Sequence, residues 1–147
     1  MFTFVGLQDQ HWSLIPDEGK PTLGTDTKGI VALDAAGTLA AACCFDNWSF
    51  NSCHIHIYIA NPFVLRYGAA YEVFNYAFNT CGMGLVIGVT AADNTKALKF
   101  LKHIGLREIY KIQDGYKEGV DFIITQLRKE DCKWVTQPKQ LNSVGVN

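Results

Sequence analysis

The clearest pattern in the chain is a strict alternation of apolar and polar residues between Ser52 and Ile59. Successive side chains of a β-strand point to opposite faces of a sheet, so this alternation predicts a strand with one buried face. Proline has no N–H group to donate to a ladder, so Pro62 marks the end of the strand. The expected buried face carries Cys53, Ile55, Ile57 and Ile59, and the opposite face carries His54, His56 and Tyr58.

Other apolar runs predict further strands. The segment 34–37 is expected to be the turn of a hairpin, because Gly37 suits a turn position with positive φ. The segment 113–119 is expected to turn the chain between the last two strands. The additional strands are expected at residues 2–5, 29–33, 38–45, 85–90, 106–112 and 120–127.

Two segments have the periodicity of amphipathic helices. The first covers residues 66–80, and Gly82 is expected to be its C-terminal cap. The second is expected to begin at a cap formed by Asp93 or Asn94 and to end at Gly105. The buried face of the first helix is expected to hold Ala70, Val73, Phe74 and Ala77, which recur at the spacing of one helix face.

The order of these elements predicts an α/β fold of the α+β kind, a mixed sheet with helices packed on its faces. Two strand–helix–strand units favour local parallel pairing. A length of 147 residues fits one domain, so residues 1–147 are expected to form a single unit. Its ends are an atypical N-terminal segment, 1–28, without a predicted amphipathic helix and with a loop at 17–27, and a C-terminal tail, 132–147.

Composition and charge exclude several functional classes. A formal net charge of -1 creates no general field for nucleic acid or for a membrane surface, so neither partner is expected. No apolar run approaches the roughly 20 residues that span a bilayer. The N-terminus lacks the basic and apolar regions of a signal peptide, so we expect a cytoplasmic protein. The odd cysteine count of 5, with no C-x-x-C pair, indicates buried reduced thiols rather than disulfides or a zinc site, and no metal is expected.

The segment 58–70, YIANPFVLRYGAA, has the pattern of an anion-binding site. A strand ends there, and a helix begins at the small residues Gly68, Ala69 and Ala70. The first turn of a helix has unpaired N–H groups and a partial positive charge, and small residues allow a phosphate to approach. Arg66 adds a full charge and Tyr67 an aromatic face. The alternative is that the small residues only permit tight packing of the helix on the sheet.

Two motifs together resemble the signatures of the GCN5-related N-acetyltransferase (GNAT) family. Asn94, Ala97, Phe100 and Gly105 match the pattern Asn-x-x-Ala-x-x-aromatic followed by Gly, and Leu106 replaces the usual Phe. The segment 65–70 resembles the Arg/Gln-x-x-Gly-x-Gly/Ala signature, with the basic residue displaced by one position. The resemblance covers residues 29–127, and small members encoded by bacteriophages look most similar, partly because of late Gly-Val-Asp and Cys-Lys-Trp segments.

The resemblance implies a GNAT-like acyl-CoA N-acyltransferase fold, with a shortened N-terminal helical region, that uses acetyl-CoA as co-substrate. In the family, two neighbouring core strands splay apart and the pantetheine arm of the cofactor enters the gap. The first strand would offer the backbone groups of Tyr58, Ile59 and Ala60. The pyrophosphate would rest on the N–H groups of Arg66, Tyr67, Gly68, Ala69 and Ala70. Asn94 would reach the cofactor arm from the opposite side, and Phe100 on the same helix would also contact the cofactor.

The resemblance also implies transfer of an acetyl group to an amine of a small molecule or a protein by direct attack on the thioester. His54 is the candidate base, since histidine titrates near neutral pH, and the N–H of Tyr58 is the candidate oxyanion donor. His56 is the second candidate base. The alternative is that both histidines are half-buried polar residues of a solvated face, or a fragment of a metal site that lacks a third ligand.

The sequence departs from the family pattern at two points. The tyrosine that usually protonates the leaving thiolate is Leu101 here, and only Tyr110, Tyr116 or water remain as substitutes. The two helices that usually shape the acceptor pocket are missing, so the pocket is either open or completed by a second subunit in a homodimer. A second hypothesis is therefore a catalytically weak or inactive bacteriophage protein of this fold that binds a host or virion protein. A third, remote hypothesis is metal-dependent hydrolysis through His54, His56 and Cys53.

Overall fold

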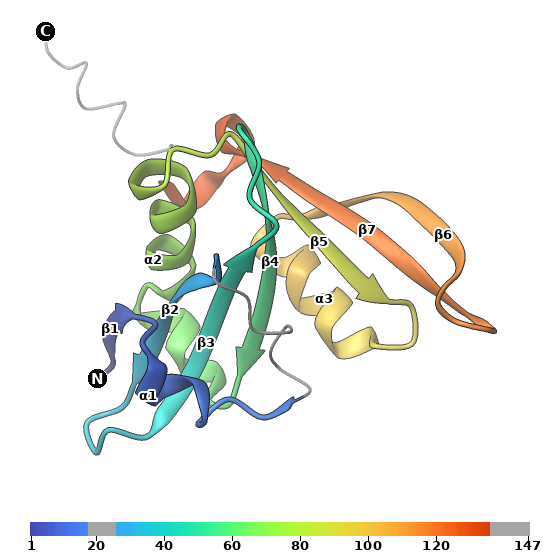
Figure 1. Ribbon diagram of the computed structural model, residues 1–147. Coiled ribbons are helices and arrows are strands. Elements are labelled where there is room, and N and C mark those ends of the chain that lie inside the picture. Colours follow the sequence, from blue (N-terminus) through green and yellow to red (C-terminus); the bar gives the residue numbers. More distant parts are fainter. Residues whose placement is uncertain (18–25, 136–147) are drawn as a thin grey trace, which may run out of the picture.

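The computed structural model describes residues 1–17 and 26–135, which form one mixed sheet with its two longer helical segments on one face (Figure 1). The order of strands across the sheet is β1-β2-β3-β4-β5-β7-β6. Neighbouring strands are antiparallel except β4 and β5, which are parallel. The strands are β1 (Thr3–Gly6), β2 (Lys28–Leu33), β3 (Leu39–Asp46), β4 (Ser52–Ile59), β5 (Leu85–Ala91), β6 (Arg107–Lys117) and β7 (Val120–Arg128).

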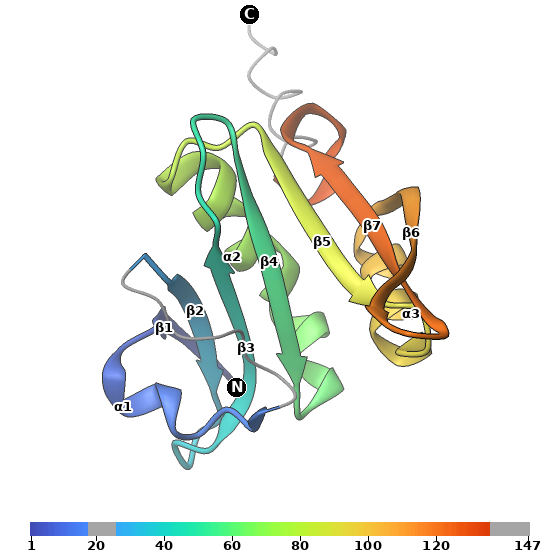
Figure 2. The same ribbon diagram turned by 45° about the vertical axis from the view of Figure 1, so that its right-hand side comes forward.

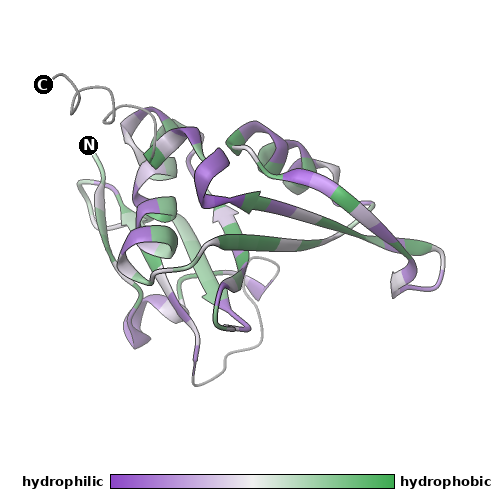
Figure 3. Cartoon of the chain, turned by 90° about the horizontal axis from the view of Figure 1, so that it is seen from above, coloured by the Kyte–Doolittle hydropathy of each residue, from purple (hydrophilic) through white to green (hydrophobic). Residues whose placement is uncertain are grey.

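The main core lies between the sheet and two helical segments. The first segment consists of α2 (Ala69–Asn75) and one π-helical turn, η3 (Tyr76–Thr80), and the second is α3 (Thr95–Ile104). Both contribute to the same buried cluster, in which Phe74, Ala77 and Leu101 meet Cys53 and Ile55 of β4. The apolar residues of this cluster therefore lie between the sheet and the helices. Hydropathy colouring shows largely hydrophobic strands beside helices that carry both hydrophobic and hydrophilic residues (Figure 3). The predicted apolar face of residues 52–59 is confirmed.

The N-terminal residues cover part of the opposite face of the sheet. A one-turn helix, α1 (Asp9–Trp12), follows β1, and Ile15 is buried against Val31, Ala42 and Cys44. The sequence predicted no helix here, and a helix of 4 residues is too short to show a 3.6-residue period. Within the described residues, no helix is long and apolar enough to cross a membrane.

The first predicted helix, 66–80, is wrong at its start. A 3₁₀ helix, η2 (Pro62–Tyr67), comes first, because Asn61 caps it by accepting a hydrogen bond from the Phe63 N–H (3.0 Å) and proline favours the first helical position. Gly68 then takes a left-handed conformation (φ 91°), and α2 begins only at Ala69. The predicted boundaries of the second helix are confirmed, since Asn94 caps α3 and Gly105 ends it with φ 115°.

Two predictions for the last strands are wrong. The second strand–helix–strand unit does not pair in parallel, because β7 lies between β5 and β6. The predicted turn at 113–119 is mostly strand, since β6 continues to Lys117. The hairpin of β6 and β7 projects from the rest of the sheet (Figures 1 and 2). Of the expected tail, residues 133–135 are helical, and most of the expected loop at 17–27 lies outside the described residues.

Candidate active site

The parallel pair β4 and β5 separates after only three residue pairs. The pairs are Ser52 with Leu85, Cys53 with Val86, and His54 with Ile87. β4 nevertheless continues to Ile59 and β5 to Ala91, and the two strands diverge along this length (Figure 2). The expected splay of two neighbouring core strands is therefore present, and we call the space that begins beyond His54 and Ile87 the split.

Backbone groups of alternate residues in β4 point into the split. The Ala60 N–H donates to the Ala40 carbonyl of the β3 side (2.8 Å), so it does not face the split. Because alternate residues of a strand direct their N–H and C=O groups to the same neighbour, the groups of Tyr58 also point toward β3. Ile57 and Ile59 are the residues whose groups point into the split. The N–H groups of Tyr58 and Ala60 are therefore directed toward β3 and away from the split, and the expected contacts of Tyr58, Ile59 and Ala60 with a cofactor stay predictions.

An apolar cavity of about 30 Å³ lies beside the split, between the sheet and α2, and holds about one water-sized group. The structure brings four of the proposed cofactor-binding residues together here: Ile59, Ala69, Ala70 and Phe100. Arg66, Tyr67 and Asn94 do not line this cavity.

The start of α2 is open and retains unpaired amides. The Gly68 N–H donates to the Val64 carbonyl, and the first bond of α2 runs from the Glu72 N–H to the Gly68 carbonyl (3.0 Å). The N–H groups of Ala69, Ala70 and Tyr71 therefore have no partner within the helix. A Cβ at Gly68 would meet nothing within 4 Å, so no side chain obstructs this point.

Arg66 and Tyr67 lie in η2, before α2 begins, and both side chains lie against aromatic rings. The Arg66 guanidinium is 5.5 Å from the centre of the Phe63 ring, and the Tyr67 ring contacts Phe2 edge-on with 5.5 Å between centres. Asn94 serves α3 as its N-cap, because its Oδ1 accepts from the Ala97 N–H (3.2 Å). These contacts give all three side chains a structural role without any ligand.

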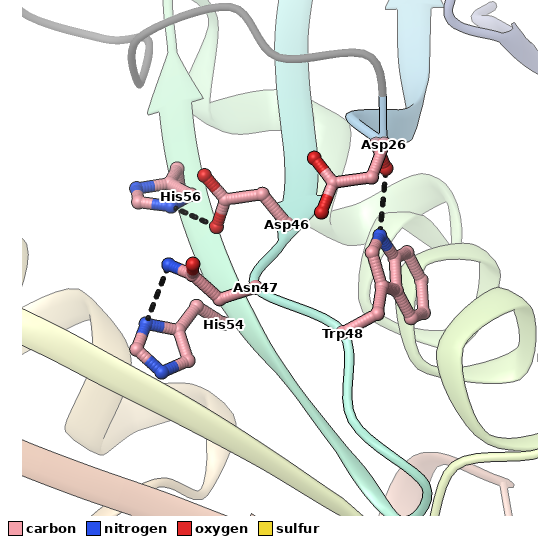
Figure 4. Close-up of polar contacts among 6 residues, drawn as sticks. All are labelled: Asp26, Asp46, Asn47, Trp48, His54 and His56. Atoms are coloured by element: carbon pink, nitrogen blue, oxygen red, sulfur yellow. Dashed lines mark hydrogen bonds and ion pairs between the residues drawn. The ribbon is translucent and has the colours of Figure 1, made fainter.

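The face of β4 opposite the helices carries a polar cluster from the β3–β4 hairpin (Figure 4). The Nε2 atom of His56 lies 2.8 Å from Oδ1 of Asp46, and Nδ1 of His54 lies 3.4 Å from Nδ2 of Asn47. Burial lowers the pKa of His54 below its usual value, with opposing contributions from Asp46, which raises it, and His56, which lowers it. His54 therefore favours the neutral form.

Sequence reasoning missed Asp46. Its position was available in principle, because the hairpin register pairs Asp46 with His54 and places His56 diagonally opposite on the same face. That register depends on the length of the loop at Asn47–Asn51, which hydrophobic alternation does not determine. No group of three potential metal ligands occurs within residues 1–17 and 26–135.

Cys53 is separated from the histidines. It is buried in the core on the opposite face of β4, and burial raises its pKa to about 12, which keeps the thiol neutral. Cys43 is likewise buried, and burial raises the pKa of its thiol. No disulfide joins any of the described cysteines.

The two tyrosines expected as substitute proton donors are separated from β4 by other strands. Leu101 is buried in the main core beneath α3. Tyr110 and Tyr116 lie on β6, which β5 and β7 separate from β4. Strands in a sheet are about 4.8 Å apart, so the backbone of β6 lies roughly 10 Å from that of β5 and farther still from β4.

Comparisons with known proteins give structural neighbours only. No protein-family model matches the sequence, and no curated protein is similar to it in sequence. A mutant of the spermidine N-acetyltransferase SpeG from Vibrio cholerae has a TM-score of 0.72 and 13% identity over 92% of this chain and 96% of that chain. The manganese complex of this spermidine/spermine N-acetyltransferase has a TM-score of 0.69 and 12% identity over 94% and 97% of the two chains.

A protein from Desulfovibrio desulfuricans, assigned to the GNAT family of acetyltransferases, is also similar in structure. Its TM-score is 0.67 at 13% identity, and the match covers 87% of this chain and 99% of that chain. At such identities the likeness shows the fold alone. The chain has the fold of the GNAT acetyltransferases, as the sequence signatures predicted, whereas the expected likeness to bacteriophage members is not tested by these structures.

Proposed function

We propose that this protein is an N-acetyltransferase that transfers the acetyl group of acetyl-CoA to an amine of a small molecule or a protein. The observation that carries the proposal is the split, because the two strands part in the middle of an otherwise continuous sheet. Backbone groups of Ile57 and Ile59 are left without a strand partner there. An extended chain with amide groups, such as a pantetheine arm, is complementary to such an open strand edge.

The residues around the split fit the cofactor that the fold implies. The unpaired amides of Ala69 and Ala70 and the open space at Gly68 suit a diphosphate, and α2 and η3 continue as one helical segment behind them. Phe100 and Ile59 border the apolar cavity beside the split. Arg66, Tyr67 and Asn94 are proposed to contact the cofactor outside this cavity.

When bound, acetyl-CoA supplies the acetyl group as an activated thioester. The protein has three tasks: it orients the thioester, donates to the carbonyl oxygen, and accepts a proton from the amine. The N–H of Ile57 is proposed as the donor in place of that of Tyr58. His54 and His56 are the two candidates for the proton acceptor.

The acceptor is proposed to be an amine that approaches the histidine-bearing face. Two of the structural neighbours carry the names of spermidine acetyltransferases, so spermidine is the first acceptor to assay, with a lysine-containing peptide as the second. Completion of this face by a second copy of the chain, and a cytoplasmic location, stay predictions.

Residue-level hydrogen exchange tests the cofactor site with an internal control. In the free protein we expect fast exchange at the amides of Ile57 and Ile59 and slow exchange at those of His56 and Tyr58, which point toward β3. Acetyl-CoA should slow exchange at Ile57 and Ile59 and leave their two neighbours unchanged. Absence of calorimetric binding at millimolar acetyl-CoA, or no added protection at these amides, would reject the proposal.

A binding protein without catalytic activity is the second candidate. It is favoured by one observation, which is that Leu101 occupies the position of the usual proton donor and is only 6% exposed. This candidate predicts cofactor binding without turnover for any amine. Steady release of free coenzyme A thiol in the presence of an amine would exclude it.

A further inference from the structure

We propose that His56, held by Asp46, accepts the proton of the attacking amine, and that His54 is not the base. This inference rests on the proposed acetyltransferase function. It concerns the two histidines of β4, which sequence reasoning ranked in the opposite order.

The first argument is position along the strand. His54 is the last residue of β4 that pairs with β5, so its backbone lies where the sheet is still closed. His56 is the next residue on the same face, two positions farther along β4, where β5 has already diverged. Its direct neighbour in the chain is Ile57, whose backbone groups point into the split. A group that takes a proton beside the thioester must border the split, and His56 meets this condition.

The second argument is the carboxylate partner. Asp46 is the last residue of β3, and its side chain is 14% exposed while that of His56 is 31% exposed. The 2.8 Å contact joins a shielded carboxylate to an imidazole that still reaches solvent (Figure 4). A carboxylate at this distance compensates the positive charge that an imidazole gains when it takes up a proton. Among the described residues, the side-chain contact of His54 is with the uncharged Asn47 at 3.4 Å, so the hydrogen-bonded carboxylate belongs to His56.

The third argument is the tautomer. A carboxylate only accepts hydrogen bonds, so Nε2 of neutral His56 carries the hydrogen that Oδ1 of Asp46 accepts. The lone pair of Nδ1 is then available for a new proton. His54 is in a different state, because burial lowers its pKa and disfavours its charged form. Other titratable groups on this face are Cys44 of β3, which pairs directly with His56, Asp46 at the end of β3, and Tyr58 on β4.

The proposed step is a simple proton transfer. One N–H bond of the protonated amine breaks, the proton moves to Nδ1 of His56, and the lone pair that remains on nitrogen attacks the thioester carbonyl carbon. The C–S bond then breaks, and the leaving thiolate takes the second proton that the nitrogen loses as the amide forms. Asp46 does not touch the substrate and is a positioning residue. The imidazolium later releases the proton to water, since His56 is partly exposed.

Kinetics of matched variants test the assignment. We expect His56→Gln to lower kcat by about 10²-fold or more and to abolish the rise of kcat with pH. Asp46→Asn should lower kcat less than His56→Gln does and should shift the pH at which kcat rises. Asp46→Glu should retain part of the rate that Asp46→Asn loses. His54→Gln should lower kcat by less than about tenfold and retain the pH profile. His103→Gln, at an exposed position of α3, is the matched control and should behave as the wild type.

Two readouts separate this proposal from the proposed function. Calorimetry should show unchanged acetyl-CoA affinity in His56→Gln, because the cofactor meets backbone groups. At a pH where histidine side chains are neutral, the ¹⁵N spectrum of the wild type should show the hydrogen of His56 on Nε2, whether or not turnover occurs. Three outcomes would each overturn the assignment while cofactor binding stands. They are turnover in His56→Gln within threefold of wild type, loss of the pH profile in His54→Gln alone, and hydrogen on Nδ1 of His56. Failure of the wild type to bind acetyl-CoA would overturn both.

Discussion

Replacement of Thr125 by valine is expected to stabilise the protein, although the residue lies in the middle of a buried strand. Thr125 belongs to β7, pairs with Gly88 of β5 and is 5% exposed. Its hydroxyl oxygen is buried and has no hydrogen-bond partner among the described residues. The surroundings are apolar. A Cβ added to Gly88 would lie against this hydroxyl oxygen and against the side chains of Leu101 and Leu106.

The magnitude follows from the cost of an unsatisfied hydroxyl. A buried polar group without a partner costs about 1–3 kcal/mol, and valine replaces it with a methyl group of similar shape. Part of this gain is lost because a methyl group is larger than a hydroxyl and the space over Gly88 is limited. We therefore expect the free energy of unfolding to rise by about 1–2 kcal/mol, which corresponds to a rise in Tm of roughly 2–8 °C for a chain of this size.

Urea denaturation of three proteins is the assay. Thr125→Val should have a higher midpoint than wild type at an unchanged m-value. Thr125→Ser retains the hydroxyl and removes the methyl group, so it should lose about 1 kcal/mol. A valine variant that is less stable than wild type would show that the hydroxyl has a partner, such as a buried water molecule, and would refute the reasoning.

Three further predictions concern stability. Burial lowers the pKa of His54, so near pH 6.5 and below the unfolded chain binds a proton more readily than the folded protein, and the free energy of unfolding decreases as the pH is lowered. His54→Gln should reduce this decrease in denaturation midpoints measured from pH 7.5 to 5, and an unchanged slope would contradict the reasoning. Gly105→Ala should lower the free energy of unfolding by about 1–2 kcal/mol, because φ at this position is 115°. Gly6 lies in open space without a positive φ, so Gly6→Ala should change the free energy of unfolding by no more than about 0.5 kcal/mol. Equal effects of the two substitutions would argue against backbone strain at Gly105. Phe74→Ala should lower the free energy of unfolding by about 3–5 kcal/mol, because the ring is fully buried. Phe50→Ala, at a fully exposed position, should leave the free energy of unfolding nearly unchanged in the same urea titration. A small decrease for Phe74→Ala would mean that the core collapses into the space left by the ring.

Local patterns predicted the elements whose conformation depends on their own residues. The strand at residues 52–59 was placed with its observed boundaries, because alternation directly reports one buried face. The α3 helix was placed correctly through its cap at Asn94 and its end at Gly105. Both features are set within a few residues of the chain.

Predictions failed where distant residues decide the conformation. The segment 113–119 was predicted to be the turn of the last hairpin, yet most of it, including Asp114 and Gly115, lies within β6. The Asp114 N–H donates to Oδ1 of Asp121 (3.0 Å), and a Cβ at Gly115 would lie 2.8 Å from Cδ2 of Phe122. Glycine is therefore required there by contact with β7 rather than by a turn, which no local pattern reveals.

The candidate site was predictable in outline only. The signatures indicated a splay and a helix start with small residues, and both are present. The direction of each N–H group in β4 depends on the register with β3. The sequence alone therefore could not show that Ile57, rather than Tyr58 or Ala60, directs its backbone groups into the split. The contact of Asp46 with His56 depends on the same register, so it could not be predicted from the sequence either.

The hairpin of β3 and β4 has a consequence for how the site assembles. Asp46 and His56 are 10 positions apart, so their contact has low contact order and needs only this hairpin to close. The far wall of the split comes from β5, which joins the sheet after the whole α2 segment has been traversed. Rigid-body displacement of the β5–β7–β6 half would therefore widen or narrow the split while the carboxylate and the imidazole keep their spacing.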